Sequence, residues 1–224
     1  MARIILCTHN SGGVGKTTLA IHITGILTSQ HGKTLLIDCD DQVDSWQFYN
    51  GTKPTKDSEF NTIIEDKLDI LENKNREKIT KKNVDPDEYE NIVIDINSPL
   101  VNTVMTMVDN KPDFVFIPVN FSRKHQALKN LSSPLNVVVE LGEKYAYSPQ
   151  VIIVPLGIKR DIVLEQIDTI EETPQNCQVA QEMRRVTAAM DKAIYKRGKY
   201  LWEYSEYTDI EEYFKTLVRK NISL

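Results

Sequence analysis

A glycine-rich loop that ends in a lysine and two threonines constrains this chain more than any other feature. Residues 11–18 read Ser-Gly-Gly-Val-Gly-Lys-Thr-Thr, directly after an apolar run, Ile4–Cys7, and directly before a helical pattern over Thr18–Gln30. Glycines let successive backbone N–H groups turn inward around phosphate oxygens, and the start of a helix adds partial positive charge. The order strand, loop and helix therefore predicts a phosphate-binding P-loop.

Three side chains of this loop have expected roles. Lys16 reaches the β- and γ-phosphates, the Thr17 hydroxyl ligates Mg²⁺, and Thr18 holds the α-phosphate. The loop departs from the general pattern at its first glycine position, which is Asn10. The residues that we expect to bind the nucleotide are Ser11, Gly12, Gly13, Val14, Gly15, Lys16, Thr17 and Thr18.

Short apolar runs of strand length recur along the chain. After Ile4–Cys7 they are Leu35–Ile37, Ile92–Ile96, Phe114–Val119 and Val151–Val154, and helical patterns lie between most of them. Continuous apolarity favours strands that are covered on both faces, and the alternation of strand and helix favours parallel pairing. We therefore expect an α/β fold with a mostly parallel central sheet and helices on both faces, in one domain over residues 1–224.

Two further helical patterns and one polar segment complete this expectation. We expect a helix over Ser122–Glu143 that Pro134 divides, and another over Asp161–Glu172. The segment Asn50–Asp87 is polar and rich in lysine, with two prolines. We expect it to be a surface excursion with one or two short helices.

Three carboxylates follow strands of the expected sheet. Asp38 and Asp40 come at the end of the second apolar run, and Asp95 comes at the end of the third. Parallel strands bring their carboxyl ends to the crevice where ligands bind. Singly, each carboxylate could equally be a helix cap or a solvated loop residue. Together beside a P-loop, they are expected to face the phosphates.

Composition excludes several other classes of protein. The chain has 224 residues and a formal charge of −5, so a globally basic nucleic-acid or membrane binder is excluded, although a local basic patch is not. Cys7, Cys39 and Cys177 form no close-spaced metal cluster, and no apolar stretch reaches the roughly 18 residues of a membrane span. The first residues do not resemble a secretory signal. We expect a cytoplasmic protein with reduced cysteines.

The same segments resemble the ParA/MinD group of P-loop ATPases, whose variant loop reads Lys-Gly-Gly-x-Gly-Lys-Thr-Thr. Residues 38–42, Asp-Cys-Asp-Asp-Gln, are similar to that group's Asp-x-Asp-Pro-Gln, with Asp41 in place of proline, and residues 89–95 are similar to its Walker B strand. The carboxyl-terminal segments that follow the order of the ParA helices are Met183-Arg184-Arg185, Gly198, Glu203-Tyr204 and residues 213–217.

The resemblance implies an ATPase that binds ATP and Mg²⁺ and forms a homodimer around two ATP molecules. Carried over by position, Lys16 binds phosphate and Asp95 holds a metal-bound water. Asp38 and Asp40 become the switch carboxylates, and Asp40 orients the attacking water. The implied metal site consists of Thr17, Asp40 and Asp95, and the implied catalytic residues are Lys16, Asp38 and Asp40. Slow turnover is expected, because such sites act by positioning and charge neutralisation.

Ser11 departs from the family pattern, which has a lysine there that reaches the partner's ATP. Two unit charges about 4 Å apart repel by roughly 4 kcal/mol at an effective dielectric constant near 20, and serine offers no compensation. Our first candidate for the replacing catalytic cation is Lys159, beside Arg160, unless these are an ordinary solvated pair. Arg123 and Lys124 are the second. Serine at this position is similar to McdA-type ATPases, which position carboxysomes.

A basic segment lies near the carboxyl terminus of this acidic protein. Six basic residues stand against one acidic residue between Arg184 and Tyr200, which suits sequence-independent contact with a duplex backbone. A solvated helix face is the alternative. The expected DNA-binding residues are Arg184, Arg185, Lys192, Lys196, Arg197, Lys199, Lys215 and Arg219.

The favoured function is therefore an ATPase that positions or segregates a cargo such as carboxysomes or a plasmid. Its expected partners are a second copy, nonspecific double-stranded DNA of the nucleoid, and an adaptor similar to McdB or ParB that stimulates hydrolysis. One alternative is a MinD-like membrane-associated ATPase, since the apolar positions of the last helix could face lipid. Others are a metabolic P-loop enzyme and a nucleotide-binding scaffold without turnover. We expect no membrane association.

Overall fold

The computed structural model describes residues 1–54, 62–64, 66–81, 84–96, 99–187 and 198–222. Within these residues, eight strands form one sheet in the order β3-β4-β2-β5-β1-β6-β7-β8. All neighbours pair in parallel except β3 and β4, which are antiparallel. The strands are β1 (Arg3–Cys7), β2 (Thr34–Cys39), β3 (Thr62–Ile64), β4 (Leu68–Glu72), β5 (Asn91–Ile96), β6 (Phe114–Asn120), β7 (Gln150–Leu156) and β8 (Cys177–Val179).

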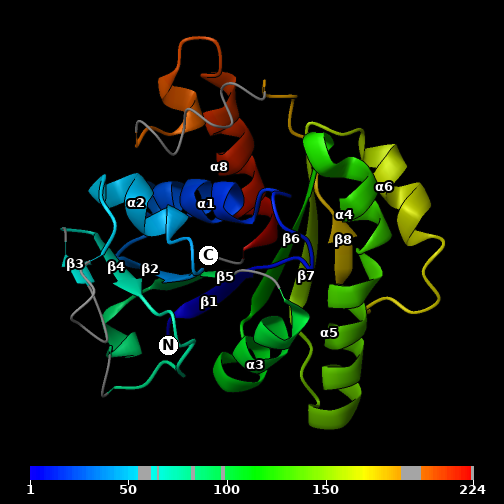
Figure 1. Ribbon diagram of the computed structural model, residues 1–224, viewed down its shortest axis with the longest axis horizontal. Coiled ribbons are helices and arrows are strands. Elements are labelled where there is room, and N and C mark those ends of the chain that lie inside the picture. Colours follow the sequence, from blue (N-terminus) through cyan, green and yellow to red (C-terminus); the bar gives the residue numbers. More distant parts are fainter. Residues whose placement is uncertain (55–61, 65, 82–83, 97–98, 188–197, 223–224) are drawn as a thin grey trace.

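Helices cover both faces of this sheet, as Figure 1 shows. One face carries α1 (Lys16–Gln30), α2 (Asp44–Asn50) and α8 (Asp209–Asn221). The other face carries α3 (Leu100–Asn110), α4 (Lys124–Lys129), α5 (Ser132–Tyr145) and α6 (Arg160–Ile167). Short 3₁₀ helices occupy η1 (Pro86–Glu88), η2 (Phe121–Arg123) and η3 (Leu201–Glu203). The expectation of a mostly parallel sheet between two helical layers is confirmed.

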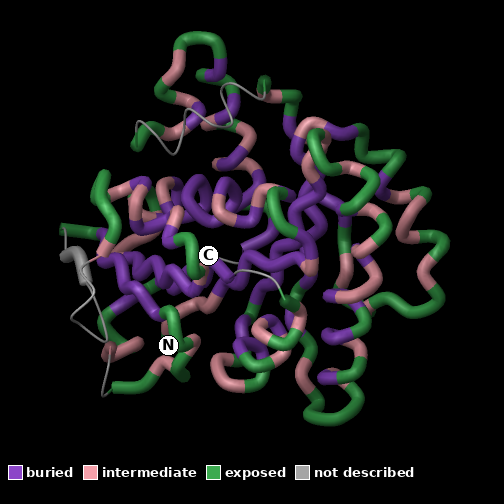
Figure 2. Tube along the Cα trace, viewed as in Figure 1, coloured by how far each residue is buried: buried purple, intermediate pink, exposed green. Residues whose placement is uncertain are grey.

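Alternation along the strands divides the core into two layers. In β1, Ile5 joins the cluster under α1, whereas its neighbour Leu6 joins the cluster on the opposite face. Successive strand residues point to opposite faces, so both neighbours must be apolar when both faces are covered. Figure 2 shows the consequence, with buried residues running through the sheet and α1 and exposed residues on the outer loops.

The expected surface excursion over Asn50–Asp87 is corrected by the structure. This segment contains β4, an inner strand whose described residues are all buried, and β3 beside it. The acidic residues Asp69 and Glu72 hide β4 in the sequence because they interrupt its apolar run. Asp69 accepts a hydrogen bond from Tyr89 at 2.7 Å and lies 2.9 Å from the Lys33 ammonium, so its charge is compensated.

Two expected helices also differ from those observed. The expected helix over Ser122–Glu143 is interrupted near Asn130, between α4 and α5, and Pro134 lies in the first turn of α5. Proline is tolerated there because the first N–H groups of a helix have no intrahelical acceptor. Helix α6 ends at Ile167, earlier than the pattern over Asp161–Glu172 indicated.

The strand register brings the predicted carboxylates together. Asp95 pairs with Asp38 across β5 and β2, and with Cys7 across β5 and β1. The loop after β1 and the ends of β2 and β5 therefore meet at one edge of the sheet. None of the described helices is long and apolar enough to cross a membrane. The extent of the domain over residues 1–224 stays a prediction.

Candidate nucleotide-binding site

Two glycines of the loop adopt backbone angles that other residues avoid. Gly13 has φ +69° and Gly15 has φ +102°. A Cβ atom at Gly15 would lie 2.6 Å from Leu156 Cδ1, closer than van der Waals contact allows. Gly15 immediately precedes α1, so the loop turns directly into the amino terminus of a helix. This is the strand–loop–helix arrangement that the sequence predicted for anion binding.

Lys16 folds back along the loop. Its Nζ donates a hydrogen bond to the Ser11 carbonyl oxygen at 2.9 Å, and the residue is 7% exposed. Burial lowers the pKa of Lys16, whereas the negative charges of Asp95 and Asp40 act in the opposite direction. The ammonium therefore lies within electrostatic reach of two of the predicted carboxylates.

Ser11 is enclosed and does not project from the loop. Its backbone N–H donates to His9 Nδ1 at 3.1 Å, its hydroxyl accepts from Asn130 Nδ2 at 2.9 Å, and it is 2% exposed. Because His9 Nδ1 is an acceptor, Nε2 carries the proton and donates to the Ala127 carbonyl at 3.1 Å. Burial, followed by the charge of Lys16, lowers the pKa of His9 to about 4. No motif in the sequence indicates these roles of His9 and Asn130.

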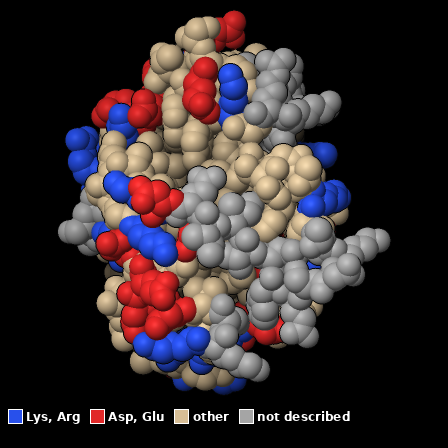
Figure 3. Space-filling model, turned by 90° about the vertical axis from the view of Figure 1, so that its left-hand side faces the viewer, with Lys and Arg blue, Asp and Glu red and all other residues tan. Residues whose placement is uncertain are grey.

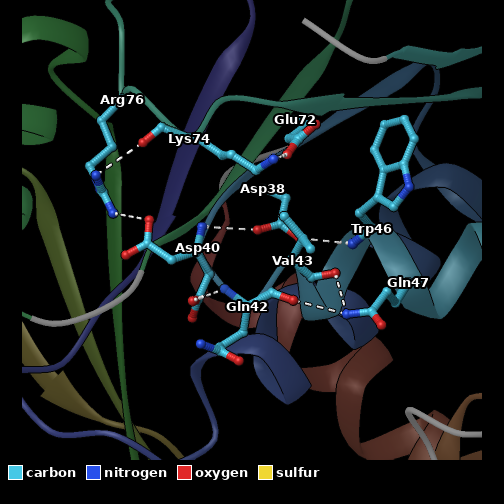
Figure 4. Close-up of polar contacts among 10 residues, drawn as sticks. Asp38, Asp40, Gln42, Val43, Trp46, Gln47, Glu72, Lys74 and Arg76 are labelled. Atoms are coloured by element: carbon cyan, nitrogen blue, oxygen red, sulfur yellow. Dashed lines mark hydrogen bonds and ion pairs between the residues drawn. The ribbon is translucent and has the colours of Figure 1, made fainter. Parts of the chain in front are cut away.

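Asp38 uses both carboxylate oxygens within the protein, as Figure 4 shows. Oδ2 accepts from the Trp46 backbone N–H at 2.8 Å, and Oδ1 accepts from the Asp40 backbone N–H at 2.9 Å. Asp38 is buried, and desolvation together with the charge of Asp95 raises its pKa. Trp46 lies in the first turn of α2, so Asp38 satisfies an amino-terminal N–H of that helix. The capping alternative is thus observed for Asp38, and its catalytic role stays a prediction.

Asp95 is buried beneath the loop. Ser45 Oγ donates to its Oδ2 at 2.6 Å, and the Thr17 hydroxyl lies near enough to lower its pKa. Burial has the largest effect and raises the pKa of Asp95 to about 6, while the charge of Lys16 lowers it. Ser45 comes from α2 and was missed, because its contact with Asp95 spans 50 positions.

Asp40 differs from Asp38 and Asp95 in the exposure of its side chain. Its Oδ1 accepts from the Gln42 backbone N–H at 2.9 Å, and no described residue hydrogen-bonds to its Oδ2. Its side chain is partly exposed, whereas Asp38 and Asp95 are buried. Asp40 therefore keeps a partly exposed oxygen available for a ligand, and Asp95 Oδ1, which is buried, also has no hydrogen-bond partner among the described residues.

The donor set at this edge fits Mg²⁺. The predicted metal residues Thr17, Asp40 and Asp95 offer a hydroxyl and two carboxylates, and hard cations prefer such oxygen ligands. No cluster of three His, Cys, Asp or Glu side chains suited to a metal occurs among the described residues. Two carboxylates with a hydroxyl instead fit an ion that takes its other ligands from phosphate oxygens and water, as Mg²⁺ does.

The two candidate replacements for the missing lysine lie in different settings. Lys159 follows β7 at the expected edge, but its Nζ lies 2.6 Å from Glu182 Oε1, and Glu182 Oε2 accepts from the Arg160 N–H at 2.8 Å. This pairing raises the pKa of Lys159. Arg123 instead lies over the P-loop, since its Nε is 3.7 Å from where a Cβ on Gly13 would stand.

The described members of the predicted DNA-binding set are largely engaged with other residues. Arg184 Nε lies 2.9 Å from Asp209 Oδ2, and the Arg185 guanidinium lies 3.6 Å from the centre of the Phe121 ring. Lys215 pairs with Glu211 at 2.7 Å. In the view of Figure 3, Lys and Arg side chains are interspersed with Asp and Glu.

The remaining members of that set are exposed or lie outside the described part. Lys199 and Arg219 are exposed. The members outside the described residues are Lys192, Lys196 and Arg197. The DNA-binding assignment of the whole set therefore stays a prediction.

Comparison with known proteins agrees with this geometry. Residues 2–85 match the family model described as an AAA domain. The apo structure of McdA from Cyanothece superposes with a TM-score of 0.74 at 17% identity and covers 100% of both chains. The chain has the fold of the ParA and MinD ATPases. The resemblance inferred from sequence is thus confirmed at the level of the fold.

Two further solved structures share this fold. A plasmid partition protein of Borrelia burgdorferi B31 bound to AMPPNP has a TM-score of 0.68 at 19% identity, covering 99% of this chain and 100% of that chain. The MinD cell division protein of Aquifex aeolicus has a TM-score of 0.60 at 19% identity, covering 100% and 99%. None of the curated protein sequences compared with the chain matches it.

Proposed function

We propose that this protein is a ParA-type ATPase that binds Mg-ATP, closes a homodimer around two ATP molecules, and hydrolyses ATP slowly. The observation that carries the proposal is the meeting of Lys16, Asp40 and Asp95 beside the glycine loop, with one oxygen of Asp40 uncommitted. The fold shared with an AMPPNP-bound partition protein and with McdA supports it.

In this proposal, each side chain does one part of phosphoryl transfer. Mg²⁺, when bound, neutralises phosphate charge. Lys16 would leave the Ser11 carbonyl and contact the β- and γ-phosphates, while Thr17 and Asp95 would hold the metal and a water bound to it. Asp40 Oδ2 accepts a hydrogen bond from the attacking water and orients it. Asp38 fixes the backbone from which Asp40 projects, through its bond to the Asp40 N–H.

Hydrolysis is tested by phosphate release from ATP in the wild type, Asp40→Asn and Lys16→Ala. Lys16→Ala should abolish nucleotide binding, whereas Asp40→Asn should still bind ATP and release phosphate at least about tenfold more slowly. An Asp40→Asn protein with wild-type turnover would remove Asp40 from this role.

The dimer requires a cation in place of the family lysine, and we propose Lys159. It is 76% exposed in its side chain and lies after β7 at the edge predicted to face the nucleotide. Lys159 would have to leave Glu182, whose exposed pairing with it is readily broken. Arg123 is the competing candidate, because it already lies over Gly13.

Light scattering with a non-hydrolysable ATP analogue separates these candidates. Lys159→Ala should prevent dimer formation while leaving nucleotide binding by the monomer intact, and Arg123→Ala should permit both. The reverse result would transfer the role to Arg123. If wild-type protein bound the analogue yet stayed monomeric, the sandwich dimer itself would be excluded.

We further propose that the dimer binds nonspecific duplex DNA and moves a cargo such as a carboxysome or plasmid, with an adaptor similar to McdB or ParB stimulating hydrolysis. A dimer doubles the basic surface, so binding should appear only with the ATP analogue and weaken steeply with salt. Fluorescence anisotropy of a labelled duplex tests this. Equal affinity with and without the analogue would contradict ATP-controlled binding at the nucleoid.

The structure favours packing over membrane insertion for α8. Its apolar residues Ile210, Phe214, Leu217 and Val218 are all buried in the core under α1. A MinD-like membrane association is therefore the less supported alternative, and flotation with anionic vesicles tests it. A metabolic P-loop enzyme would instead consume ATP only with a second substrate.

A further inference from the structure

Asp41, which stands where the family has proline, forms an ion pair that spans 35 positions of sequence. Its Oδ1 accepts from Arg76 Nη2 at 2.9 Å, and Arg76 Nη1 donates to the Lys74 carbonyl oxygen at 3.0 Å. Figure 4 shows this arginine reaching from the loop after β4 to the loop after β2. The fork of one guanidinium thus joins two loops, which lysine could not reproduce with the same geometry.

The loop that carries Arg76 is fixed to the end of β2. The Asn73 backbone N–H donates to the Asp38 carbonyl at 2.8 Å, which extends the pairing of β4 with β2. The Asn73 side chain accepts from the Glu77 N–H and donates to the Glu77 carbonyl, both at 2.9 Å, and so closes the turn. Arg76 lies at the centre of this turn with φ +55°. Arg76 therefore reaches Asp41 from a turn whose backbone is fixed by these hydrogen bonds.

The charge of Arg76 also acts beside the cluster of carboxylates formed by Asp38, Asp40 and Asp95. Burial raises the pKa of the Cys39 thiol most, the charges of Asp38 and Asp95 raise it further, and the positive charge of Arg76 acts in the opposite direction. The charge of Arg76 therefore reaches the residues around the predicted switch carboxylates, Asp38 and Asp40. Lys16 offsets this negative charge from the P-loop side, and Arg76 offsets it from the β4 side.

We propose that Arg76 is a positioning residue for ATP hydrolysis, acting through Asp41 on the neighbouring Asp40. By holding residue 41, it keeps the backbone of residues 40–42 in the turn where Asp40 Oδ1 accepts from the Gln42 N–H. Asp40 Oδ2 then stays available for the attacking water. This inference rests on the proposed ATPase function, and it gives Asp41 a use that proline could not have.

The pair should matter more for turnover than for overall stability. The Asp41 side chain is 64% exposed and that of Arg76 is 17% exposed, and exposed ion pairs contribute about 0–1 kcal/mol to folding. A small displacement of a catalytic group, in contrast, lowers a rate strongly. Loss of the pair should therefore reduce kcat with little change in KM for ATP or in Tm.

A charge swap tests the inference. Arg76→Asp and Asp41→Arg should each lower kcat about tenfold and leave KM within about twofold, and the double swap should recover most of the loss. Lys81→Asp is the matched control. Lys81 Nζ lies 2.7 Å from Asp87 Oδ2 in an exposed ion pair, and this pair is remote from the site. This variant should leave kcat unchanged. Arg76→Lys keeps the charge without the fork and should fall between wild type and Arg76→Asp.

A second readout does not depend on turnover. Hydrogen exchange at the Gln42 amide should accelerate in Arg76→Asp and slow again in the double swap. Wild-type kcat and exchange in both single variants would overturn the inference, as would a double swap no better than the worse single variant. If wild type released no phosphate but the exchange pattern held, the proposed function would fail and the loop contact would stand.

Discussion

Acidification should loosen the contact between α1 and the carboxyl-terminal segment through His22. His22 Nε2 accepts from the Leu201 N–H at 2.9 Å, so its Nδ1 carries the proton and donates to the Thr18 carbonyl at 2.6 Å. The ring is fully buried and stacks on Phe214 with centres 4.9 Å apart. Only the neutral imidazole makes both hydrogen bonds, and burial lowers its pKa to about 4.

The direction and size of the pH effect follow from this shift. An unfolded histidine has a pKa near 6.5, so the unfolded chain binds more protons between pH 6.5 and 4. The contribution of His22 to stability is complete above pH 6.5 and is lost as the pH falls toward 4. For a folded pKa of about 4, the loss from one histidine is about 2 kcal/mol at pH 5.

Urea unfolding at pH 7.5 and pH 5.0 measures this loss. Wild type should lose about 2 kcal/mol more than His22→Gln between the two pH values, because glutamine does not titrate. Trp202, whose ring centre lies 5.0 Å from that of His22, provides a fluorescence signal at the contact. His125→Gln is the control, since His125 is exposed, and it should follow wild type. Equal losses in wild type and His22→Gln would refute the reasoning.

Two substitutions in the P-loop give further tests. Ser11→Lys should lower the free energy of unfolding by about 2–4 kcal/mol and fail to strengthen the ATP-dependent dimer, because Asn130 encloses the position; urea titration and light scattering measure these effects. Gly15→Ala should weaken nucleotide binding at least about tenfold, because its methyl would meet Leu156 and strain the loop. Gly51→Ala has a comparable positive φ but open space, so a fluorescent-nucleotide titration should show unchanged affinity for it.

The fold was largely predictable because its inner strands are continuous apolar runs. The exception is β4, where Asp69 and Glu72 interrupt the apolar residues, so that the segment is similar to a solvated one. Lys74, the partner of Glu72, lies close to it in the sequence. Lys33 and Tyr89, the partners of Asp69, come from other parts of the chain, so no local pattern reveals that the charge of Asp69 is compensated. Sequence periodicity identifies strands that are apolar throughout and misses a strand whose polar positions have distant partners.

The site was predictable where strand ends determine it. Asp95 and Asp40 lie by Lys16, as the convergence of parallel strand ends required. The supporting contacts were not predictable, because Asn130 meets Ser11 across 119 positions and no motif encodes that contact. Motifs therefore located the chemistry, whereas three-dimensional packing located the residues that hold it.

The two outer strands of the sheet have a consequence for behaviour at high concentration. Within the described residues, β3 and β8 contain three residues each, and β3 runs antiparallel to β4, the strand beside it. Such short edge strands offer another chain few unpaired backbone N–H and C=O groups for hydrogen bonding, and short edges are one way in which proteins avoid aggregation. Concentrated samples of this protein should therefore not aggregate through edge-strand pairing. Any reversible assembly should depend on the nucleotide present.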